Sequence, residues 1–321
     1  MTRLMRSLLV LPAHNRRFLE KAAGSGADAV LLDLEDSVPA ADKDSARRTL
    51  VEALNELDWG RKTVMVRANG LESPWTYQDV IAVLGGAGGR FDLFMLPKVE
   101  RPGDIVTVAT LIDQVERSLG LAKPAGLDAL IETAGGLRHA EAIAEAHPRL
   151  EGLHFGPADY AASMGIRTTA MGGANPDYQM LTHPDAAGRR DSHWGDASHY
   201  PLARMAVAAR AAGLRPIDGA YADFPDIEGF RAQARRARAL GCEGKWCIHP
   251  SQVAAANELF SPSPEEVALA RRILSAMADA AHAGRAALVL DGRMIDIATV
   301  RQAQALVAKA ETIGTAYPDR L

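Results

Sequence analysis

The stretch VLLDLEDSVP, residues 30–39, begins as an apolar run and then places Asp33, Glu35 and Asp36 within four positions. Such a run is typical of a strand buried in a parallel sheet. If the strand continues through the acidic residues, alternation directs Asp33 and Glu35 to one face and Asp36 to the other. Carboxylates this close persist where a metal ion, a cationic side chain or a proton offsets their charge. The alternative is a solvated strand end before a Ser-Val-Pro turn.

Runs of the same kind recur along the chain and predict eight strands, at residues 7–12, 28–36, 63–69, 92–99, 127–133, 150–159, 214–221 and 243–250. Helix-like segments lie between them, among them residues 15–26, 45–57, 101–119 and 227–241. Eight strands alternating with helices over about 250 residues match a (β/α)8 TIM barrel. An open doubly wound sheet more often has fewer strands and a Gly-rich first turn, which this sequence lacks. We therefore predict a (β/α)8 barrel.

The predicted barrel domain covers residues 1–260, and residues 261–321 form a C-terminal helical extension that acts as a lid or an oligomer arm. In the extension, residues 261–284 predict a helix with Pro near its start, and residues 286–314 predict a short strand or turn before a last helix. A long segment rich in Gly, His and aromatic residues connects the sixth and seventh strands. Long ordered segments at such positions usually serve binding.

Composition excludes several classes of function. The net charge of −4 and the isoelectric point near 6.2 argue against a nucleic-acid or membrane-surface binder, which needs a concentrated positive field. No apolar stretch reaches the length of about 20 residues that spans a bilayer. Two cysteines, Cys242 and Cys247, suggest neither a zinc site nor a disulfide framework. We expect a cytoplasmic protein in a reduced compartment.

Polar side chains gather at the predicted strand ends. In a (β/α)8 barrel the active site lies at the C-terminal ends of the strands. Each residue taken alone could be a helix cap or a solvated terminus, but their recurrence at the same end of successive strands predicts an active site. The set comprises Asp33, Glu35, Asp36, Arg67, Asn69, Lys98, Glu132, Asp159 and His249.

Glu132 and Asp159 follow the predicted fifth and sixth strands. Carboxylates without accompanying Cys or His suit a hard divalent cation, Mg2+ before Zn2+, and leave room for water and a chelating substrate. Glu35 and Asp36 would then orient metal-bound water or offset nearby cationic side chains as part of the catalytic site. The alternative is that Glu132 is a helix N-cap or interacts with a helix dipole in IETAGG, and that Asp159 is an N-cap in GPADYAAS.

Two further residues are candidates for catalysis. Arg67 offers a planar fork suited to a carboxylate or an enolate oxygen, although it could instead form a structural ion pair with Glu35. Asp296, in LDGRMID, could supply an acid/base if the C-terminal extension folds over a barrel mouth. Its local alternative is a helix N-cap.

Several segments, in order along nearly the whole chain, resemble the HpcH/HpaI aldolase/citrate lyase β-subunit family, which includes malyl-CoA lyases. The segments that carry this resemblance are RSLLVLPAHNRRFLEKA, GADAVLLDLEDSVP, VRANG, MLPKVE, IETAGGL, FGPADYAASMG, GKWCIHPSQV and LDGRMIDIA. Within the family, the malyl-CoA/β-methylmalyl-CoA lyase branch is most similar, through LNELDWGRKTVMVRANGLESPW, FGPADYAASMGIRTT, DGAYADFPDIEGFRAQARRARALG and GKWCIHPSQ.

The resemblance implies a Mg2+ site at Glu132 and Asp159, with Mn2+ as a substitute, and a substrate contact at Arg67. It implies that the substrate and CoA site also includes Val10, Arg16, Lys21, Ala158, Asp159, Ile248 and His249. It further implies that Asp296 is the acid/base on a C-terminal lid, delivered from a neighbouring subunit of a homotrimer or homohexamer.

The reaction implied is reversible Claisen-type cleavage of a 3-carboxy-3-hydroxyacyl-CoA. L-malyl-CoA would give acetyl-CoA and glyoxylate, and β-methylmalyl-CoA would give propionyl-CoA and glyoxylate. The resemblance thus implies a CoA thioester and glyoxylate or a similar 2-oxo acid as the small-molecule partners. Mg2+ and Arg67 would offset the developing charge, and Asp296 would protonate the enolate. The alternatives are a malyl-CoA thioesterase, a citramalyl-CoA lyase or citrate lyase β-subunit, and a non-catalytic barrel whose carboxylates are caps.

Overall fold

The structure is a computed structural model that describes residues 3–167, 171–173, 175, 177–193, 195–282 and 286–316. The chain divides into two compact units, one of Met5–Asn257 and the other of Glu258–Leu321 with Met1–Leu4. Among the described residues, no helix is long and apolar enough to cross a bilayer.

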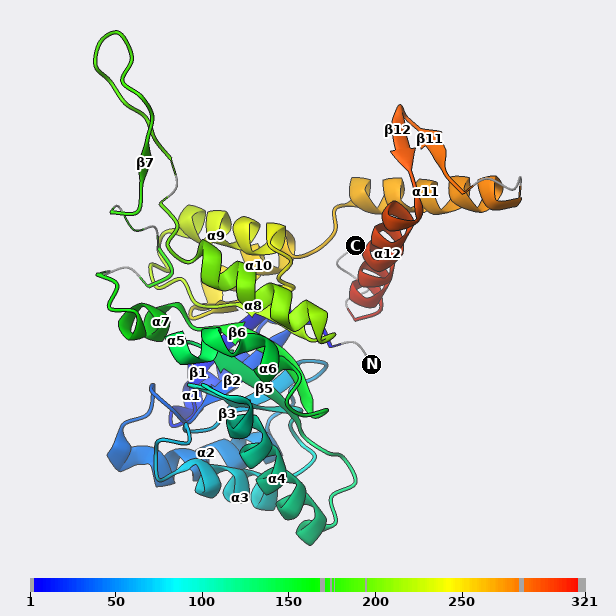
Figure 1. The fold of residues 1–321 in the computed structure, drawn as a ribbon. Helices are drawn as coiled ribbons and strands as arrows, with labels where there is room; N and C mark the ends of the chain where they lie inside the picture. Colours follow the sequence, from blue (N-terminus) through cyan, green and yellow to red (C-terminus); the bar gives the residue numbers. More distant parts are fainter. Residues whose placement is uncertain are drawn as a thin grey trace. The chain divides into compact units, whose positions relative to one another are not determined.

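Eight of the described strands form a closed parallel barrel, in the order β1-β10-β9-β6-β5-β4-β3-β2 (Figure 1). Each lies within a segment that the sequence predicted as a strand or begins one residue before it, so the predicted (β/α)8 fold is confirmed. The strands are β1 (Ser7–Pro12), β2 (Ala29–Asp33), β3 (Thr63–Arg67), β4 (Leu93–Leu96), β5 (Gly126–Ile131), β6 (Leu150–Phe155), β9 (Arg215–Asp218) and β10 (Gly244–Cys247).

Helices surround the barrel, and several of them cover the outer faces of its strands (Figure 1). They are α1 (Arg16–Ala23), α2 (Lys43–Glu56), α3 (Thr76–Ala87), α4 (Pro102–Leu119), α5 (Ala134–Arg138), α6 (Ala140–Ala144), α7 (Pro157–Ser163), α8 (His199–Ala211), α9 (Ile227–Ala239) and α10 (Val253–Leu259). Local signals mark their ends. At the start of α4, Asp104 accepts a hydrogen bond from the backbone N–H of Arg101, and Gly120 ends the helix in the left-handed conformation.

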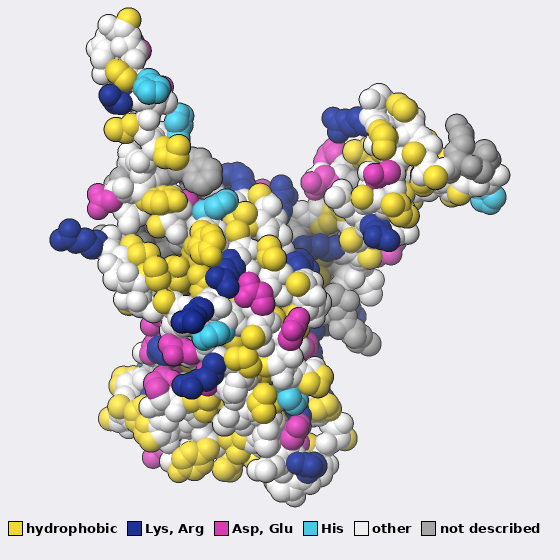
Figure 2. All heavy atoms as spheres, in the orientation of Figure 1, with side chains coloured by type: hydrophobic (Ala, Val, Ile, Leu, Met, Phe, Trp, Pro, Cys, Tyr) yellow, Lys and Arg dark blue, Asp and Glu magenta, His cyan; other side chains and the backbone are white. Residues whose placement is uncertain are grey.

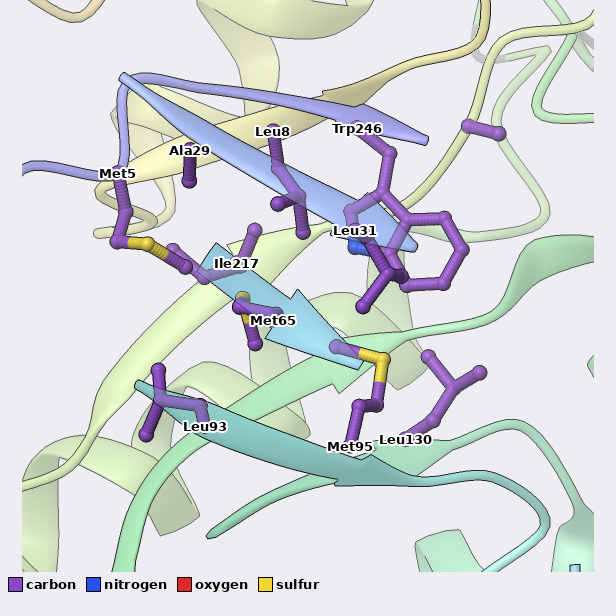
Figure 3. Packing of buried hydrophobic residues seen from close by; sticks show 11 residues of the cluster. Met5, Leu8, Ala29, Leu31, Met65, Leu93, Met95, Leu130, Ile217 and Trp246 are labelled. Atoms are coloured by element: carbon purple, nitrogen blue, oxygen red, sulfur yellow. The ribbon is translucent and has the colours of Figure 1, made fainter. Parts of the chain in front are cut away.

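The strands are mostly apolar on both faces because helices cover one face and the barrel interior the other. All five residues of β2 are buried. Alternate residues of the strands point inward and form a core that includes Leu8, Leu31, Met65 and Trp246 (Figure 3). This period-two alternation decides which strand-end residues face the interior. Over the visible face of the barrel, positive and negative side chains are interspersed with apolar ones (Figure 2).

The long segment between α7 and α8 contains a short antiparallel hairpin, β7 (Met180–Leu181) with β8 (Ser192–His193). Met180 and Leu181 are exposed on it. Part of this segment lies outside the described residues. Its predicted role in binding stays a prediction.

The second unit contains α11 (Pro264–His282), the hairpin of β11 (Leu288–Leu290) and β12 (Arg293–Ile295), and α12 (Ile297–Ala316). The sequence predicted this order of helix, short strand and helix. Ile273, Ile295 and Ala303 are buried in a small core of the unit's own. Its role as a lid or oligomer arm stays a prediction.

Candidate active site

A cavity of about 430 Å3 lies at the C-terminal ends of the barrel strands. Its polar wall comes from Asp33, Asp36, Ser37, Arg67, Glu132 and Asp159. Its apolar wall includes Val10, Leu130, Phe155, Ala158, Met171, Ala220, Trp246 and Ile248. The structure therefore gathers most of the residues singled out in the sequence around one space.

Glu132 follows β5 and is almost completely buried. Its Oε1 accepts a hydrogen bond of 2.8 Å from the backbone N–H of Lys98, which fixes one carboxylate oxygen. Burial, and next the negative charge of Asp159, raise the pKa of Glu132 well above its ordinary value. Thr133, and not Glu132, caps α5 by accepting from the N–H of Gly136 at 2.9 Å. The cap interpretation of Glu132 is therefore wrong.

Asp159 lies in the first turn of α7 and is half-buried. The N-cap of this helix is Gly156, so the N-cap interpretation of Asp159 is also wrong. A Cβ added at Gly156 would lie 2.4 Å from the Oε2 of Glu132, so a side chain at position 156 would occupy the space of that carboxylate. Glycine lets the two carboxylates share one end of the cavity.

This pair of carboxylates fits a hard divalent cation. A buried carboxyl with a raised pKa beside a second carboxylate is a site where negative charge lacks full compensation, and a bound cation would supply it. Within the described residues, no group of three or more His, Cys, Asp and Glu side chains is arranged to hold a metal. A cation between Glu132 and Asp159 would therefore complete its shell with water or substrate, as Mg2+ commonly does.

Arg67 ends β3 and forms a bidentate ion pair with Asp33 at the end of β2. Nε lies 2.6 Å from Oδ1, and Nη2 lies 2.6 Å from Oδ2. Burial alone would raise the pKa of Asp33, but the charge and hydrogen bonds of Arg67 hold it below its ordinary value. The expected pairing of Arg67 with Glu35 also occurs, with Nη1 at 3.1 Å from Oε2. Cationic side chains thus offset the acidic cluster of the second strand.

Lys98 contacts the other two carboxylates of that cluster. Its Nζ forms ion pairs with Glu35 and, at 3.1 Å, with Asp36. Burial raises the pKa of Glu35 above its ordinary value. Oε2 of Glu35 faces Arg67 but accepts no well-aligned hydrogen bond from the described part of the chain.

The predicted course of the second strand is wrong at its end. β2 stops at Asp33, so Glu35 and Asp36 lie beyond the strand and are not placed by alternation. The chain turns there because Asp33 accepts hydrogen bonds from the backbone N–H groups of Glu35 and Ser37, at 2.8 and 3.2 Å. A solvated strand end is also excluded for Asp33 and Glu35, which are buried, whereas Asp36 is exposed.

The residues implied to bind substrate and CoA divide into two groups. Val10, Ala158 and Ile248 line the cavity, as described above. Arg16 lies on α1 and pairs with Glu20 at 3.0 Å and Glu56 at 2.9 Å, while Lys21 on the same helix is exposed; neither lies in the cavity wall. His249 also lies outside it. Its ring stacks on Phe224 at a centroid distance of 4.6 Å, and Nδ1 contacts the hydroxyl of Ser251 at 2.8 Å.

Asp296 belongs to the second unit. It precedes α12, and its carboxylate accepts from the backbone N–H of Thr299 at 3.0 Å and from the Thr299 hydroxyl at 3.1 Å. The alternative interpretation as an N-cap is therefore confirmed. These hydrogen bonds hold the pKa of Asp296 below its ordinary value.

Two residues that shape the site were not predicted from the sequence. Trp246 lines the cavity, and strand alternation in EGKWCIHP could have placed it inside the barrel. Lys43, on α2, donates to the carbonyl oxygens of Leu34 at 2.6 Å and Glu35 at 2.8 Å, and so holds the acidic turn in place. No local sequence signal identifies this role of Lys43.

Comparisons with known proteins agree with the geometry. The profile of the HpcH/HpaI aldolase/citrate lyase family matches residues 6–250. The L-malyl-CoA/beta-methylmalyl-CoA lyase of Cereibacter sphaeroides is 47% identical over 302 residues, which are 94% of this chain and 93% of the relative. A (3S)-malyl-CoA thioesterase of the same species is 37% identical over 308 residues, covering 96% of this chain and 95% of the relative.

Among solved structures, protein CitE of Mycobacterium tuberculosis, in complex with magnesium, acetoacetate and coenzyme A, is similar with a TM-score of 0.72 and 30% identity. The match covers 95% of this chain and 97% of that protein. The predicted family is therefore confirmed. The predicted enzyme class, carbon–carbon lyases, is confirmed at the level of the family. The chain belongs to the HpcH/HpaI aldolase/citrate lyase family.

Proposed function

We propose that the protein is a divalent-cation-dependent lyase that reversibly cleaves L-malyl-CoA to acetyl-CoA and glyoxylate, and β-methylmalyl-CoA to propionyl-CoA and glyoxylate. The observation that carries the proposal is the cavity in which Glu132 and Asp159 face the same space as Arg67. Two carboxylates for a cation and one guanidinium for an anion suit a substrate that carries a carboxylate next to a hydroxyl group. The relative at 47% identity bears this activity in its name.

Glu132 and Asp159 would hold Mg2+, with Mn2+ as a substitute that accepts the same oxygen ligands. When bound, the cation supplies Lewis-acid stabilisation of negative charge on a substrate oxygen. Contacts within the chain determine where both carboxylate oxygens of Glu132 lie. The N–H of Lys98 fixes one oxygen of Glu132, and Gly156 leaves the other oxygen its space.

Arg67 would bind the substrate carboxylate and offset the charge that develops as the carbon–carbon bond breaks. Its guanidinium cannot rotate freely, because Asp33 holds two of its nitrogens and Glu35 faces the third. Such a group needs little reorganisation during the reaction. Glu35 and Asp36 would keep Lys98 in place beside it and so set the local balance of charge.

Asp296 would be the acid/base, brought by the C-terminal unit to a cavity of its own or a neighbouring subunit in a homotrimer or homohexamer. At neutral pH a partly exposed aspartate is a carboxylate, the state that takes a proton from the acyl-CoA in the condensation direction. The proposal includes a cytoplasmic location. Cys242 and Cys247 are free and buried, as expected for a protein in a reducing compartment.

Replacing Asp296 with Asn should lower kcat by about a hundredfold or more, because Asn cannot transfer the proton. Binding of the CoA thioester and the melting temperature should stay near wild-type values, since Asn is as good an N-cap as Asp. The Asp296→Ala variant should lose in addition about 1 kcal/mol of stability with the cap. Full turnover of Asp296→Asn would remove Asp296 from the mechanism.

A second candidate is the hydrolysis of malyl-CoA, because a named thioesterase is also similar over nearly the whole chain. One assay separates the two. Purified protein is mixed with malyl-CoA, with and without Mg2+, and glyoxylate and free CoA are followed together. Glyoxylate formed with acetyl-CoA supports the lyase. Free CoA without glyoxylate supports the thioesterase, and no Mg2+-dependent product at all overturns both.

A further inference from the structure

A chain of three polar side chains lies buried inside the barrel and ends at the cavity. It runs from Asp128 on β5 to His154 on β6 and then to Trp246 on β10. Nε2 of His154 lies 2.9 Å from Oδ2 of Asp128, and Nε1 of Trp246 lies 2.9 Å from Nδ1 of His154. Asp128 and His154 do not line the cavity, and only Trp246 reaches it.

The contacts fix which nitrogen of His154 carries the proton. An indole N–H can only donate, so Nδ1 of His154 must accept the hydrogen bond from Trp246. The proton of the imidazole is then on Nε2, which donates to the carboxylate of Asp128. Each hydrogen bond in the chain has one defined direction, and each orients the next side chain.

These three buried polar side chains need space inside the barrel, and burying the carboxylate of Asp128 is energetically unfavourable. Asp128 lies opposite Gly152 on β6, and a Cβ at Gly152 would lie 3.0 Å from both oxygens of Asp128. Interior layers of such barrels are usually filled by branched apolar side chains. Burial of a carboxylate is strongly unfavourable unless partners compensate its charge. Oδ1 of Asp128 is buried without a hydrogen-bond partner in the described chain, so compensation is incomplete.

The ring of Trp246 connects the buried chain to the proposed chemistry. It lines the cavity, and Cζ of Arg67 lies 5.7 Å from its centroid. A guanidinium at this distance is attracted to the face of an indole ring. Asp33 therefore holds Arg67 through its nitrogens, while the guanidinium lies over the ring of Trp246. A rotation of the indole would move a wall of the cavity and release one side of Arg67.

We propose that His154 is a positioning residue of the active site, which orients the indole of Trp246 and, through it, the guanidinium of Arg67. Asp128 supports it by holding the imidazole in the tautomer that accepts from Trp246. This inference rests on the proposed function for its effect on turnover, but the link between His154 and Trp246 stands on geometry alone.

Two conservative substitutions separate the two hydrogen bonds of His154. In His154→Asn the side-chain oxygen can take the place of Nδ1 and accept from Trp246. In His154→Gln the longer side chain places its amide where Nε2 was. The amide can still donate to Asp128, but the indole N–H of Trp246 loses its acceptor. Both variants replace the ring by an amide, and each is the control for the other.

We expect His154→Gln to lower kcat/KM by about tenfold or more, and His154→Asn to stay within about threefold of wild type. Trp246→Phe should lower kcat/KM at least as much as His154→Gln, because it also changes the cavity wall. The double variant should show no loss beyond that of Trp246→Phe, because without the indole N–H residue 154 has nothing left to orient. Equal losses in the Asn and Gln variants, or additive losses in the double variant, would overturn the proposal.

The ultraviolet resonance Raman band that reports hydrogen bonding of the indole N–H gives a readout without turnover. The signal of Trp246 is the difference between wild type and Trp246→Phe. It should show a bonded indole in wild type and His154→Asn, and an unbonded one in His154→Gln. An unchanged band in His154→Gln overturns the link. If wild type cleaves no malyl-CoA, the proposed function fails, and the Raman result still decides the link.

Discussion

Replacing Asp159 with Asn should abolish Mg2+-dependent cleavage of malyl-CoA, with a loss in kcat/KM of about a thousandfold or more. The substitution keeps the volume of the side chain but removes the charge that pairs with a cation. Asp159 is half-buried and accepts no hydrogen bond that holds α7 together, so the barrel should stay folded. The measurement is steady-state turnover over a range of Mg2+ concentrations.

The same variant should lose stabilisation by Mg2+. A cation that binds only the folded protein raises the free energy of unfolding by about 2.7 kcal/mol at a hundred times its dissociation constant. The melting temperature of wild type should therefore rise with Mg2+, and that of Asp159→Asn should not. Asp58→Asn is the matched control, since Asp58 is exposed and lies in the loop before β3, at the opposite end of the strand. Wild-type activity in Asp159→Asn would exclude the metal site.

Replacing Arg67 with Met should remove activity and also cost about 3–5 kcal/mol of stability, because it leaves the carboxylate of Asp33 buried without its counter-charge. The loss should depend on pH. In wild type, the lowered pKa of Asp33 contributes stability that is present above the pKa of the unfolded chain and lost as the pH falls. Without Arg67, burial favours the protonated form, so the destabilisation should be larger at pH 8 than near pH 4. Urea unfolding at the two pH values measures this difference.

Arg6 offers a matched control for Arg67. It too is buried and bidentate, with Nε and Nη2 each 2.7 Å from the oxygens of Asp28, but the pair lies before β1 and β2, at the N-terminal end of the barrel. Arg6→Met should lose stability to a similar extent and keep the turnover of each folded molecule. If both variants lose turnover equally, the effect of Arg67 is one of folding and not of catalysis.

The fold could be predicted because buried parallel strands produce a repeated, local signal. Each barrel strand needs apolar residues on both faces, and a run such as Ala29–Asp33 shows this without knowledge of its neighbours. The location of the site followed from the same pattern, since polar residues at the ends of successive strands meet at one end of a barrel. Glu132, Asp159 and Arg67 were found in this way.

Features that depend on the stagger between strands could not be predicted. Asp33 faces Arg67 because the two residues are register partners in β2 and β3, and the sequence alone suggested Glu35 as the partner instead. The contact of His154 with Trp246 crosses from β6 to β10 and leaves no trace in either segment. For Asp296, the role as a helix cap could be predicted because it depends only on neighbouring residues. A role in catalysis depends on another part of the chain or on a second subunit, and local sequence does not reveal it.

The pairing of β1 with β10 has a consequence for synthesis of the protein. Ser7 and Leu9 of β1 pair with Lys245 and Cys247 of β10. The barrel therefore cannot close until β10, its last strand in the sequence, has been synthesised. Until then the growing chain has two open strand edges, which readily pair with other chains. Contacts between such distant residues also form slowly, because a long loop must be closed first. We therefore expect the newly made chain to be most prone to aggregation until the segment that ends at Cys247 has been synthesised, and a chaperone to protect it most during that interval.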